Sequence, residues 1–125
     1  MIRGIGVDMT SISRIEKAMA HPRFEAKVLG EDERLETKQT PRHAAARWAA
    51  KEAVAKALGC GFAGFGLRDI QLLHHENGAP YIVLSGQALE TACRIAGDLG
   101  SWWVSITHEG DFAIAMVVWE NNSKL

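Results

Sequence analysis

The stretch from Ala44 to Leu58 most constrains how this chain can fold, because its side chains are apolar on nearly every side of a helical wheel. It is rich in strong helix formers and contains neither Gly nor Pro. We therefore expect one long helix that begins near Pro41 and closes at Gly59. A helix that is apolar all round is a buried helix, so other segments of the chain must cover it on several sides.

The segments around this helix predict strands that can cover it. Ile5 and Val7 lie on one face of a short strand from Ile2 to Val7, while Gly4 and Gly6 leave the other face bare for close packing. This strand is expected to end at Asp8. Two antiparallel pairs should follow, joined through Asn77-Gly78 and through a turn at residues 109–111: Leu67–Leu73 with Tyr81–Leu84, and Trp103–Thr107 with Phe112–Trp119. The pattern predicts an α+β fold with mostly antiparallel strands and one long buried helix.

Shorter helices and a connector complete the predicted organisation. Helical spacing of apolar residues predicts helices from Ser11 to about Ala20 and from Gln87 to Asp98. Ser13 and Glu16 form a capping-box pattern at the start of the first of these. Pro22 should open a short helical stretch that Gly30 terminates, and the charged run from Glu31 to Lys38 is expected to be a solvated connector.

Length, charge and cysteine content limit the class of protein. The 125 residues fit a single domain, 1–125, that can bury a core of its own. A formal net charge of -1 gives no reason to expect binding to nucleic acid or to an anionic membrane. No apolar run approaches the ~20 residues of a membrane span, and Cys60 and Cys93 lack metal-ligand spacing. We expect a cytoplasmic protein.

The charged residues of the long helix are informative because that helix is buried. Arg47 and Lys51 lie one turn apart on one side, and Glu52 and Lys56 lie one turn apart on another. These could be two structural features of the helix, with Glu52 and Lys56 a favourable ion pair. However, a buried carboxylate without a partner costs several kcal/mol, so Glu52 needs either Lys56 or a metal ion as its cation.

Asp8, after the first strand, is a second candidate acid, although it could also be a helix-flanking cap. Two carboxylates from separate elements are a usual way to hold Mg²⁺ beside a substrate. Arg47, Lys51, Lys56 and the glycine-rich loop at residues 59–66 would suit a polyphosphate. His108 closes a strand just before a turn, where a structural histidine is the alternative to a functional one.

Six segments, taken in order, carry a resemblance to a known family. They are GIGVDMTSISRIE (Gly4–Glu16), FEAKVLGEDE (Phe24–Glu33), RWAAKEAVAKALGCG (Arg47–Gly61), LRDIQL (Leu67–Leu72), NGAPYIVLSG (Asn77–Gly86) and VSITHEGDFAIAMVV (Val104–Val118). The chain resembles the holo-(acyl-carrier-protein) synthases, the short trimeric class of the 4'-phosphopantetheinyl transferase superfamily. This resemblance covers nearly the whole chain and implies a 4'-phosphopantetheinyl transferase-like fold.

The resemblance implies an enzyme of fatty acid biosynthesis that moves 4'-phosphopantetheine from coenzyme A to a serine of apo acyl carrier protein, with release of 3',5'-ADP. It also implies Mg²⁺ as cofactor and a homotrimer with an active site between neighbouring subunits. By position, Asp8 and Glu52 match the metal ligands of the family, and Lys56 matches its pyrophosphate-contacting lysine. These three residues would carry the catalysis.

Further residues receive roles from the same resemblance. Arg47 and His108 fall at positions associated with coenzyme A binding. Arg14 matches the basic position that docks the acidic helix of the carrier protein, and Lys17 would assist it. Two other functions stay open at this point: a Mg²⁺-dependent nucleotide or phosphodiester hydrolase, and a noncatalytic module that binds carrier protein.

Overall fold

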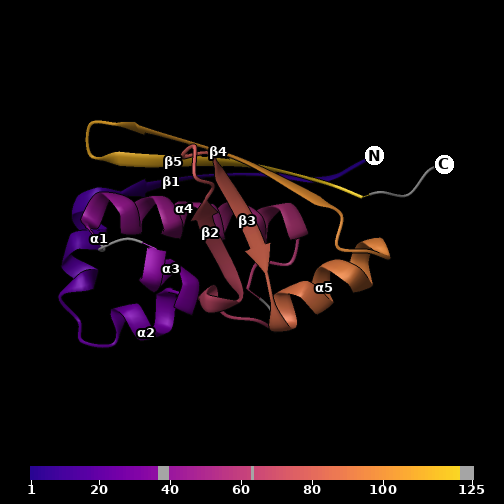
Figure 1. The fold of residues 1–125 in the computed structure, drawn as a ribbon, viewed down its shortest axis with the longest axis horizontal. Coiled ribbons are helices and arrows are strands. Elements are labelled where there is room, and N and C mark those ends of the chain that lie inside the picture. Colours follow the sequence, from indigo (N-terminus) through magenta and orange to yellow (C-terminus); the bar gives the residue numbers. More distant parts are fainter. Residues whose placement is uncertain (37–39, 63, 122–125) are drawn as a thin grey trace.

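The computed structural model describes residues 1–36, 40–62 and 64–121, whose elements Figure 1 labels. In chain order these elements are β1 (Ile2–Ser11), α1 (Ile12–Met19), α2 (Phe24–Val28), α3 (Glu31–Glu36), α4 (Pro41–Leu58), the 3₁₀ turn η1 (Leu67–Asp69), β2 (Ile70–His74), β3 (Pro80–Leu84), α5 (Gly86–Ala96), β4 (Ser101–Glu109) and β5 (Phe112–Glu120). The long helix α4 is confirmed with the bounds that its sequence predicts.

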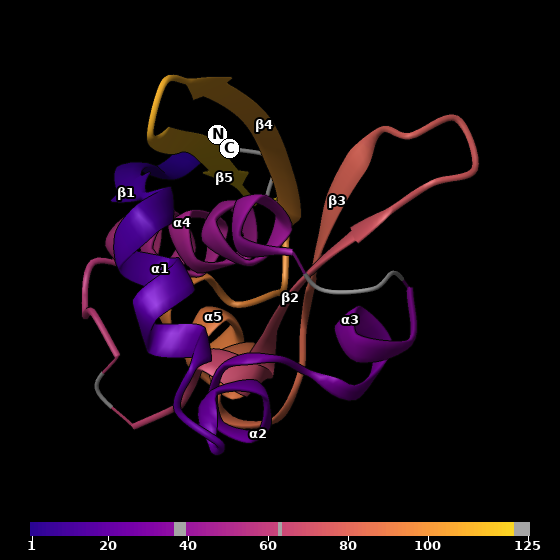
Figure 2. The ribbon, with the colours of Figure 1, turned by 90° about the vertical axis from the view of Figure 1, so that its left-hand side faces the viewer.

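The strands form two antiparallel sheets, which confirms the predicted α+β class. One sheet has three strands in the order β1-β5-β4, and the other is the hairpin of β2 and β3. Figures 1 and 2 show the helices of the described chain on one side of the three-stranded sheet, with α4 directly against it. None of these helices is both long and apolar enough to cross a membrane.

Close packing between β1 and α4 brings the two central elements of the fold together. The backbone of Gly6 lies against Ala53, and that of Gly4 lies against Ala57, one helical turn further along. A Cβ atom at either glycine would overlap the carbonyl oxygen of its alanine. The glycines of β1 are therefore required by a close approach, as the bare face of this strand predicts, and not by backbone conformation.

The first strand is longer than its sequence predicts, and the following helix begins differently. β1 continues past Asp8 to Ser11 because it stays paired with β5 as far as Ser11 opposite Phe112. Ser11 then caps α1, since its Oγ accepts a hydrogen bond from the amide of Arg14 at 3.2 Å. The predicted capping box of Ser13 and Glu16 is therefore wrong, because the capping residue is Ser11, two residues earlier.

The predicted solvated connector is also wrong within residues 31–36, which form α3; its last two residues, 37–38, lie outside the described part of the chain. One tertiary contact and one local contact start this helix. The Oε1 atom of Gln71 accepts hydrogen bonds from the amides of Asp32 and Glu33 at 3.0 and 3.2 Å. Oε1 of Glu33 accepts the amide of Gly30 at 2.9 Å. Both contacts satisfy amides that the first turn of a helix leaves without partners.

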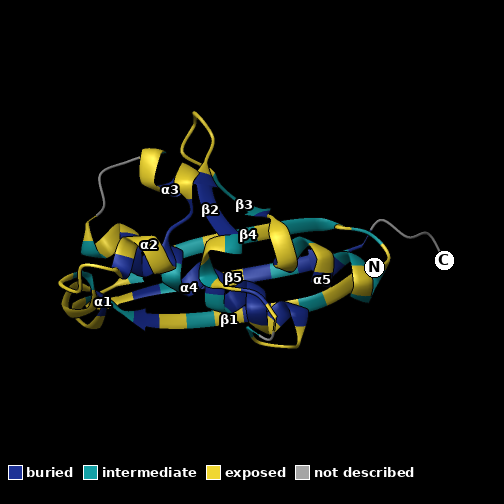
Figure 3. Cartoon of the chain, turned by 90° about the horizontal axis from the view of Figure 1, so that it is seen from below, coloured by how far each residue is buried: buried dark blue, intermediate teal, exposed yellow. Residues whose placement is uncertain are grey.

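A buried group of charges links α3 to α4 and to the almost entirely buried strand β2 (Figure 3). Lys51 Nζ lies 2.6 Å from Oε1 of Glu33, and both side chains are fully buried. Lys51 also donates to the carbonyls of Leu67 and Ile70. Burial lowers the pKa of Lys51, and the charge of Glu33 opposes that effect. Removing one partner from such a pair costs about 3–5 kcal/mol because the other charge stays buried.

The substitution Gly6→Ala should destabilise the protein by more than about 2 kcal/mol, because the added methyl group forces β1 and α4 apart. Gly66→Ala is the matched control, since nothing lies within 4 Å of a Cβ at that position and its φ of -110° suits alanine. Its effect should stay within about 0.5 kcal/mol. Urea unfolding of both variants measures the difference, and equal stabilities would contradict the packing described here.

Candidate active site

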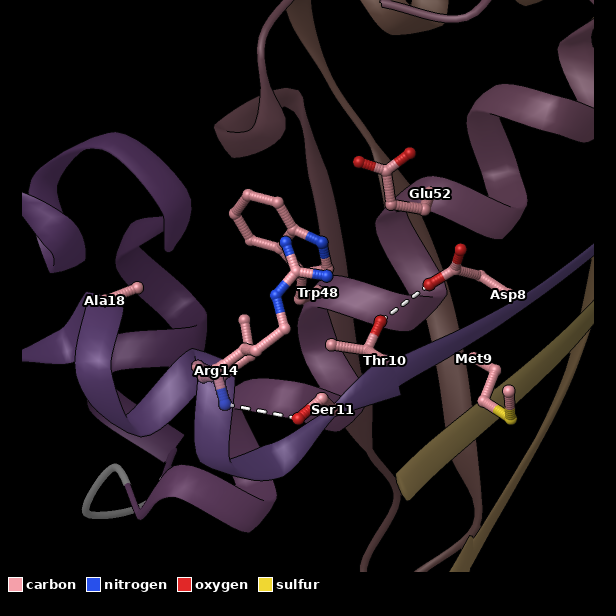
Figure 4. Close-up of a pocket in the computed structure, with 9 residues that line it drawn as sticks. Asp8, Met9, Thr10, Ser11, Arg14, Ala18, Trp48 and Glu52 are labelled. Atoms are coloured by element: carbon pink, nitrogen blue, oxygen red, sulfur yellow. Dashed lines mark hydrogen bonds between the residues drawn. The ribbon is translucent and has the colours of Figure 1, made fainter. Parts of the chain in front are cut away.

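A cavity of about 400 Å³ opens where the end of β1 meets α1 and the middle of α4. Figure 4 shows its lining side chains. The cavity wall includes Asp8, Thr10, Ser11, Arg14, Trp48 and Glu52. Three residues that the sequence predicts to be functional, Asp8, Arg14 and Glu52, therefore line this cavity. A fourth, Lys56, lies next to Asp8.

The close contact between β1 and α4 explains why two acids share the cavity. Asp8 is two residues beyond Gly6 on the same face of β1, and Glu52 directly precedes Ala53 on α4. The Gly6 contact with Ala53 therefore fixes both acids near one another at the edge of the sheet. Figure 4 shows the Asp8 side chain, from β1, and the Glu52 side chain, from α4, at the same end of the cavity.

Each oxygen of the Asp8 carboxylate has a neighbour that orients it. Thr10 Oγ1 donates a hydrogen bond to Oδ2 at 2.6 Å (Figure 4). Lys56 Nζ lies 3.5 Å from Oδ1 and donates to the carbonyl of Val7 at 2.9 Å. The Lys56 side chain is 55% exposed, whereas that of Asp8 is only 17% exposed. Lys56 is thus placed beside the acids with its ammonium group open to a ligand.

The electrostatics of the two acids favour a bound cation. Burial raises the pKa of Glu52, the negative charge of Asp8 raises it further, and Lys56 lowers it. Two carboxylates from separate elements are hard oxygen ligands of the kind that Mg²⁺ takes, with waters and phosphate oxygens in the other positions. The chemistry of this carboxylate pair therefore fits Mg²⁺.

The two predicted docking residues lie on α1. Arg14 lines the cavity, and Lys17 follows three residues later in the last turn of the helix. Both are exposed. Since residues three apart share a helix face, α1 presents two positive charges beside the acids.

The structure does not bring Arg47 to the cavity, although the sequence predicts it at a coenzyme A site. Its side chain is only 2% exposed, and its Nη2 atom donates to Oε1 of Glu36 at 2.7 Å. Its Nε donates to the carbonyl of Leu72 at 3.2 Å. The physical reason is the position of Arg47 on α4, one turn from Lys51, on the side that α3 and β2 cover. A contact with coenzyme A would require the guanidinium to leave these partners.

His108 lies at the end of β4, and it does not line the cavity of its own chain. Burial lowers the pKa of His108, and the nearby charge of Arg42 lowers it further. Its Nε2 atom is buried and has no hydrogen-bond partner among the residues that the structure describes. The predicted coenzyme A contact of His108 therefore needs a ligand that reaches it from outside this cavity.

Sequence reasoning missed two residues of the site. Thr10 was not identified because the strand was expected to end at Asp8; the continued strand brings every second side chain to the same face, which a longer strand assignment would have revealed. Trp48 was not identified because a tryptophan on a buried helix is usually a core residue, whereas the structure leaves it half-buried in the cavity wall. Its position one turn before Glu52 was the available signal.

Comparison with known proteins shows the family to which this chain belongs. The profile of the 4'-phosphopantetheinyl transferase superfamily matches residues 4–117. The holo-[acyl-carrier-protein] synthase of Solidesulfovibrio magneticus is 42% identical over 124 residues, which cover 96% of this chain and 99% of the relative. The holo-[acyl-carrier-protein] synthase of Herpetosiphon aurantiacus is 40% identical over 122 residues, which cover 90% of this chain and 94% of the relative.

Solved structures agree as well. The holo-[acyl-carrier-protein] synthase of Neisseria meningitidis superposes with a TM-score of 0.85 at 34% identity, covering 97% of this chain and 100% of that one. The Helicobacter pylori synthase in complex with coenzyme A has a TM-score of 0.78 at 32% identity. The match covers 93% of this chain and 99% of that one. The chain belongs to the 4'-phosphopantetheinyl transferase superfamily, as its motifs predict. Within that superfamily its relatives are the holo-(acyl-carrier-protein) synthases, and it is a transferase enzyme.

The coupling between the two acids predicts opposite effects of two substitutions on Glu52. Asp8→Asn should lower the pKa of Glu52 because it removes a negative neighbour, and Lys56→Met should raise it because it removes a positive one. Each shift should be on the order of one pH unit or less at this partly exposed site. The measurement is a ¹³C NMR titration of labelled glutamate in the absence of divalent cations.

The sign for stability follows from the raised pKa of Glu52. A carboxyl whose pKa is higher in the folded than in the unfolded chain destabilises the fold once it ionises, and protonation at lower pH relieves that cost. Asp8→Asn should therefore reduce this part of the pH dependence. If the pKa of Glu52 were the same in wild type, Asp8→Asn and Lys56→Met, the idea that these residues share one site would be contradicted.

Proposed function

We propose that this chain transfers the 4'-phosphopantetheine group of coenzyme A to a serine of apo acyl carrier protein, giving holo carrier protein and 3',5'-ADP in fatty acid biosynthesis. The observation that carries this proposal is the placement of Asp8 and Glu52 in the wall of one cavity, with Lys56 beside Asp8. The comparisons support it, since a related enzyme of Helicobacter pylori was solved with coenzyme A. They give no support to a hydrolase or to a noncatalytic module.

Asp8 and Glu52 would hold Mg²⁺ in this proposal. The support is their origin on separate elements, their shared cavity and the pKa of Glu52, which a neighbouring negative charge raises. When bound, Mg²⁺ would neutralise negative charge on the pyrophosphate of coenzyme A. Thr10 would keep Oδ2 of Asp8 oriented through its hydrogen bond.

The reaction forms a bond between the serine oxygen and the β-phosphorus and breaks the bond from that phosphorus to the bridging oxygen, which leaves with 3',5'-ADP. The serine proton passes to one of the two carboxylates, directly or through water. Lys56 would stabilise the negative charge that develops on the leaving phosphate, because its ammonium lies beside Asp8 and is open to solvent. Positioning and charge stabilisation account for most of the rate in such transfers.

The surface formed by α1 and α2 would dock the carrier protein. Arg14 and Lys17 supply positive charge beside the cavity. A second, mostly apolar cavity of about 280 Å³ adjoins this helix, with walls that include Phe24, Val28 and Trp48 and with Arg23 and Lys27 among its lining residues. This combination fits an acidic helix that carries an apolar side chain. Attraction between opposite charges would raise the association rate of the two proteins, and added salt would weaken this attraction.

The outer face of the three-stranded sheet supports a homotrimer. This face carries exposed apolar side chains from all three strands, with exposed fractions of 62% for Ile5, 56% for Val7, 61% for Met9, 59% for Trp103 and 49% for Met116. Monomeric proteins rarely expose apolar patches of this extent. Two further copies of the chain would cover the face, as the resemblance to the trimeric class implies.

Assembly would also give His108 a role. It lies away from the cavity of its own chain, and its buried Nε2 has no partner among the described residues. We place coenzyme A between subunits, where His108 of one protomer would contact coenzyme A bound at the acids of the next.

We propose no direct contact for Arg47, because its guanidinium is engaged inside the protein. The cytoplasmic location expected from the sequence belongs to this proposal.

Incubation with apo acyl carrier protein, coenzyme A and Mg²⁺ should add one phosphopantetheine group to the carrier, as detected by mass spectrometry, and a chelator should prevent it. Glu52→Gln should reduce the rate by at least about 10²-fold while the fold persists. Glu90→Gln, an exposed change on α5, is the matched control and should keep full activity. Near-normal turnover by Glu52→Gln would count against the metal site. Cleavage of coenzyme A without carrier would favour a hydrolase.

The trimer can be tested by sedimentation. The wild-type chain should sediment as three copies, and Met116→Glu should shift it toward the monomer because each interface would bury an unpaired charge. Leu35→Glu, a change at a 77% exposed position on α3, is the control that should leave the trimer intact. A wild-type chain that sediments as a monomer at micromolar concentration would contradict the assembly.

A further inference from the structure

The turn between β4 and β5 is joined to the start of α1, about a hundred residues away in the sequence. The backbone carbonyl of Asp111 accepts a hydrogen bond from the amide of Ile12 at 2.7 Å. Its Oδ1 accepts the amide of Ser13 at 3.0 Å. Its Oδ2 accepts the hydroxyl groups of Ser11 and Ser13 at 2.8 and 2.7 Å. Asp111 thus accepts hydrogen bonds from three consecutive residues, Ser11, Ile12 and Ser13, at the start of α1.

These contacts matter because α1 is short. A helix of eight residues is marginal by itself, and its first amides need partners. Asp111 supplies partners for Ile12 and Ser13, while Ser11 supplies one for Arg14. A negative charge at this end of a helix is also favourable. Hydrogen bonds from Ser13 and Ser11 lower the pKa of Asp111, so the carboxylate is ionised at neutral pH.

The same junction borders the active site. Ser11 lines the cavity, and its hydroxyl, held by Asp111, accepts the amide of Arg14 (Figure 4). Arg14 lines that cavity as well. The position of the Arg14 backbone relative to Asp8 therefore depends on Ser11, and through Ser11 on the turn that carries Asp111.

We propose that Asp111 is a positioning residue for the carrier protein. It fixes the first turn of α1, so that a carrier bound to Arg14 presents its serine to Asp8 and Glu52. This inference rests on the proposed docking role of α1. Asp111 acts through Ser11 and Ser13 and touches neither substrate. Its loss should therefore weaken productive carrier binding and leave the binding of coenzyme A unchanged.

Steady-state kinetics of the full-length enzyme with apo acyl carrier protein tests this role. Asp111→Ala should raise KM for the carrier by about fivefold or more, with KM for coenzyme A and kcat at saturating carrier within about twofold of wild type. Asp111→Asn keeps an oxygen that can accept the Ser13 amide, so it should restore most of the carrier affinity. Ser13→Ala, which removes one hydroxyl donor, should raise carrier KM by a smaller factor and serves if Asp111→Ala does not fold.

Glu109→Ala is the matched control, because it removes an equal charge from the end of β4, two residues away, and the Glu109 side chain forms no hydrogen bond or ion pair with α1 within the described part of the chain. It should leave carrier KM unchanged. Arg14→Glu, measured in parallel, separates this inference from the proposed function. If Arg14→Glu raises carrier KM while Asp111→Ala lowers only the melting temperature, Asp111 is merely structural and the inference fails alone. If Glu109→Ala matches Asp111→Ala, net charge explains the effect and the inference is overturned.

Discussion

The contact between the bare face of β1 and the small-residue face of α4 is the constraint on which the rest of the structure depends. Gly6 against Ala53 and Gly4 against Ala57 leave no room for a side chain between strand and helix. This contact fixes the register of the two elements, and the register places Asp8 beside Glu52. The same packing that closes the core thus builds the acid pair of the active site, without a separate loop to position it.

Helix α4 carries two kinds of charge, and the helical repeat separates them. Lys51 faces inward, where Glu33 and backbone carbonyls compensate its charge. Glu52, the next residue, turns by about 100° toward the cavity, and Lys56 follows one turn later. The inward charges hold α3 and β2 onto the helix. The outward charges remain available for chemistry, and the rigid inward network limits how far they can move.

The sequence predicted α4, both antiparallel pairings and α5, because hydrophobic periodicity and turn residues are local signals. Its strand from Leu67 was wrong over Leu67–Asp69, which form the 3₁₀ turn before β2. It missed α3, since that helix starts on Gln71, which is distant in sequence. It ended β1 too early because the pairing of Ser11 with Phe112 is likewise a long-range contact. For the same reason it could not tell that Arg47 would be used inside the protein, or that Lys56 would form its ion pair with Asp8 of β1, when the spacing on the helix suggested Glu52 as its partner.

By itself, the sequence determined which residue types stand at which spacing: a glycine-spaced strand followed closely by an acid, a buried helix with charges one turn apart, and motifs that identify the superfamily. Those are properties of neighbouring residues. Only the tertiary structure decided which charges are internal and which reach the cavity, that Thr10 orients Asp8, and that Asp111 holds the start of α1. These depend on where distant segments meet, because burial and hydrogen-bond partners are set by packing rather than by position in the chain.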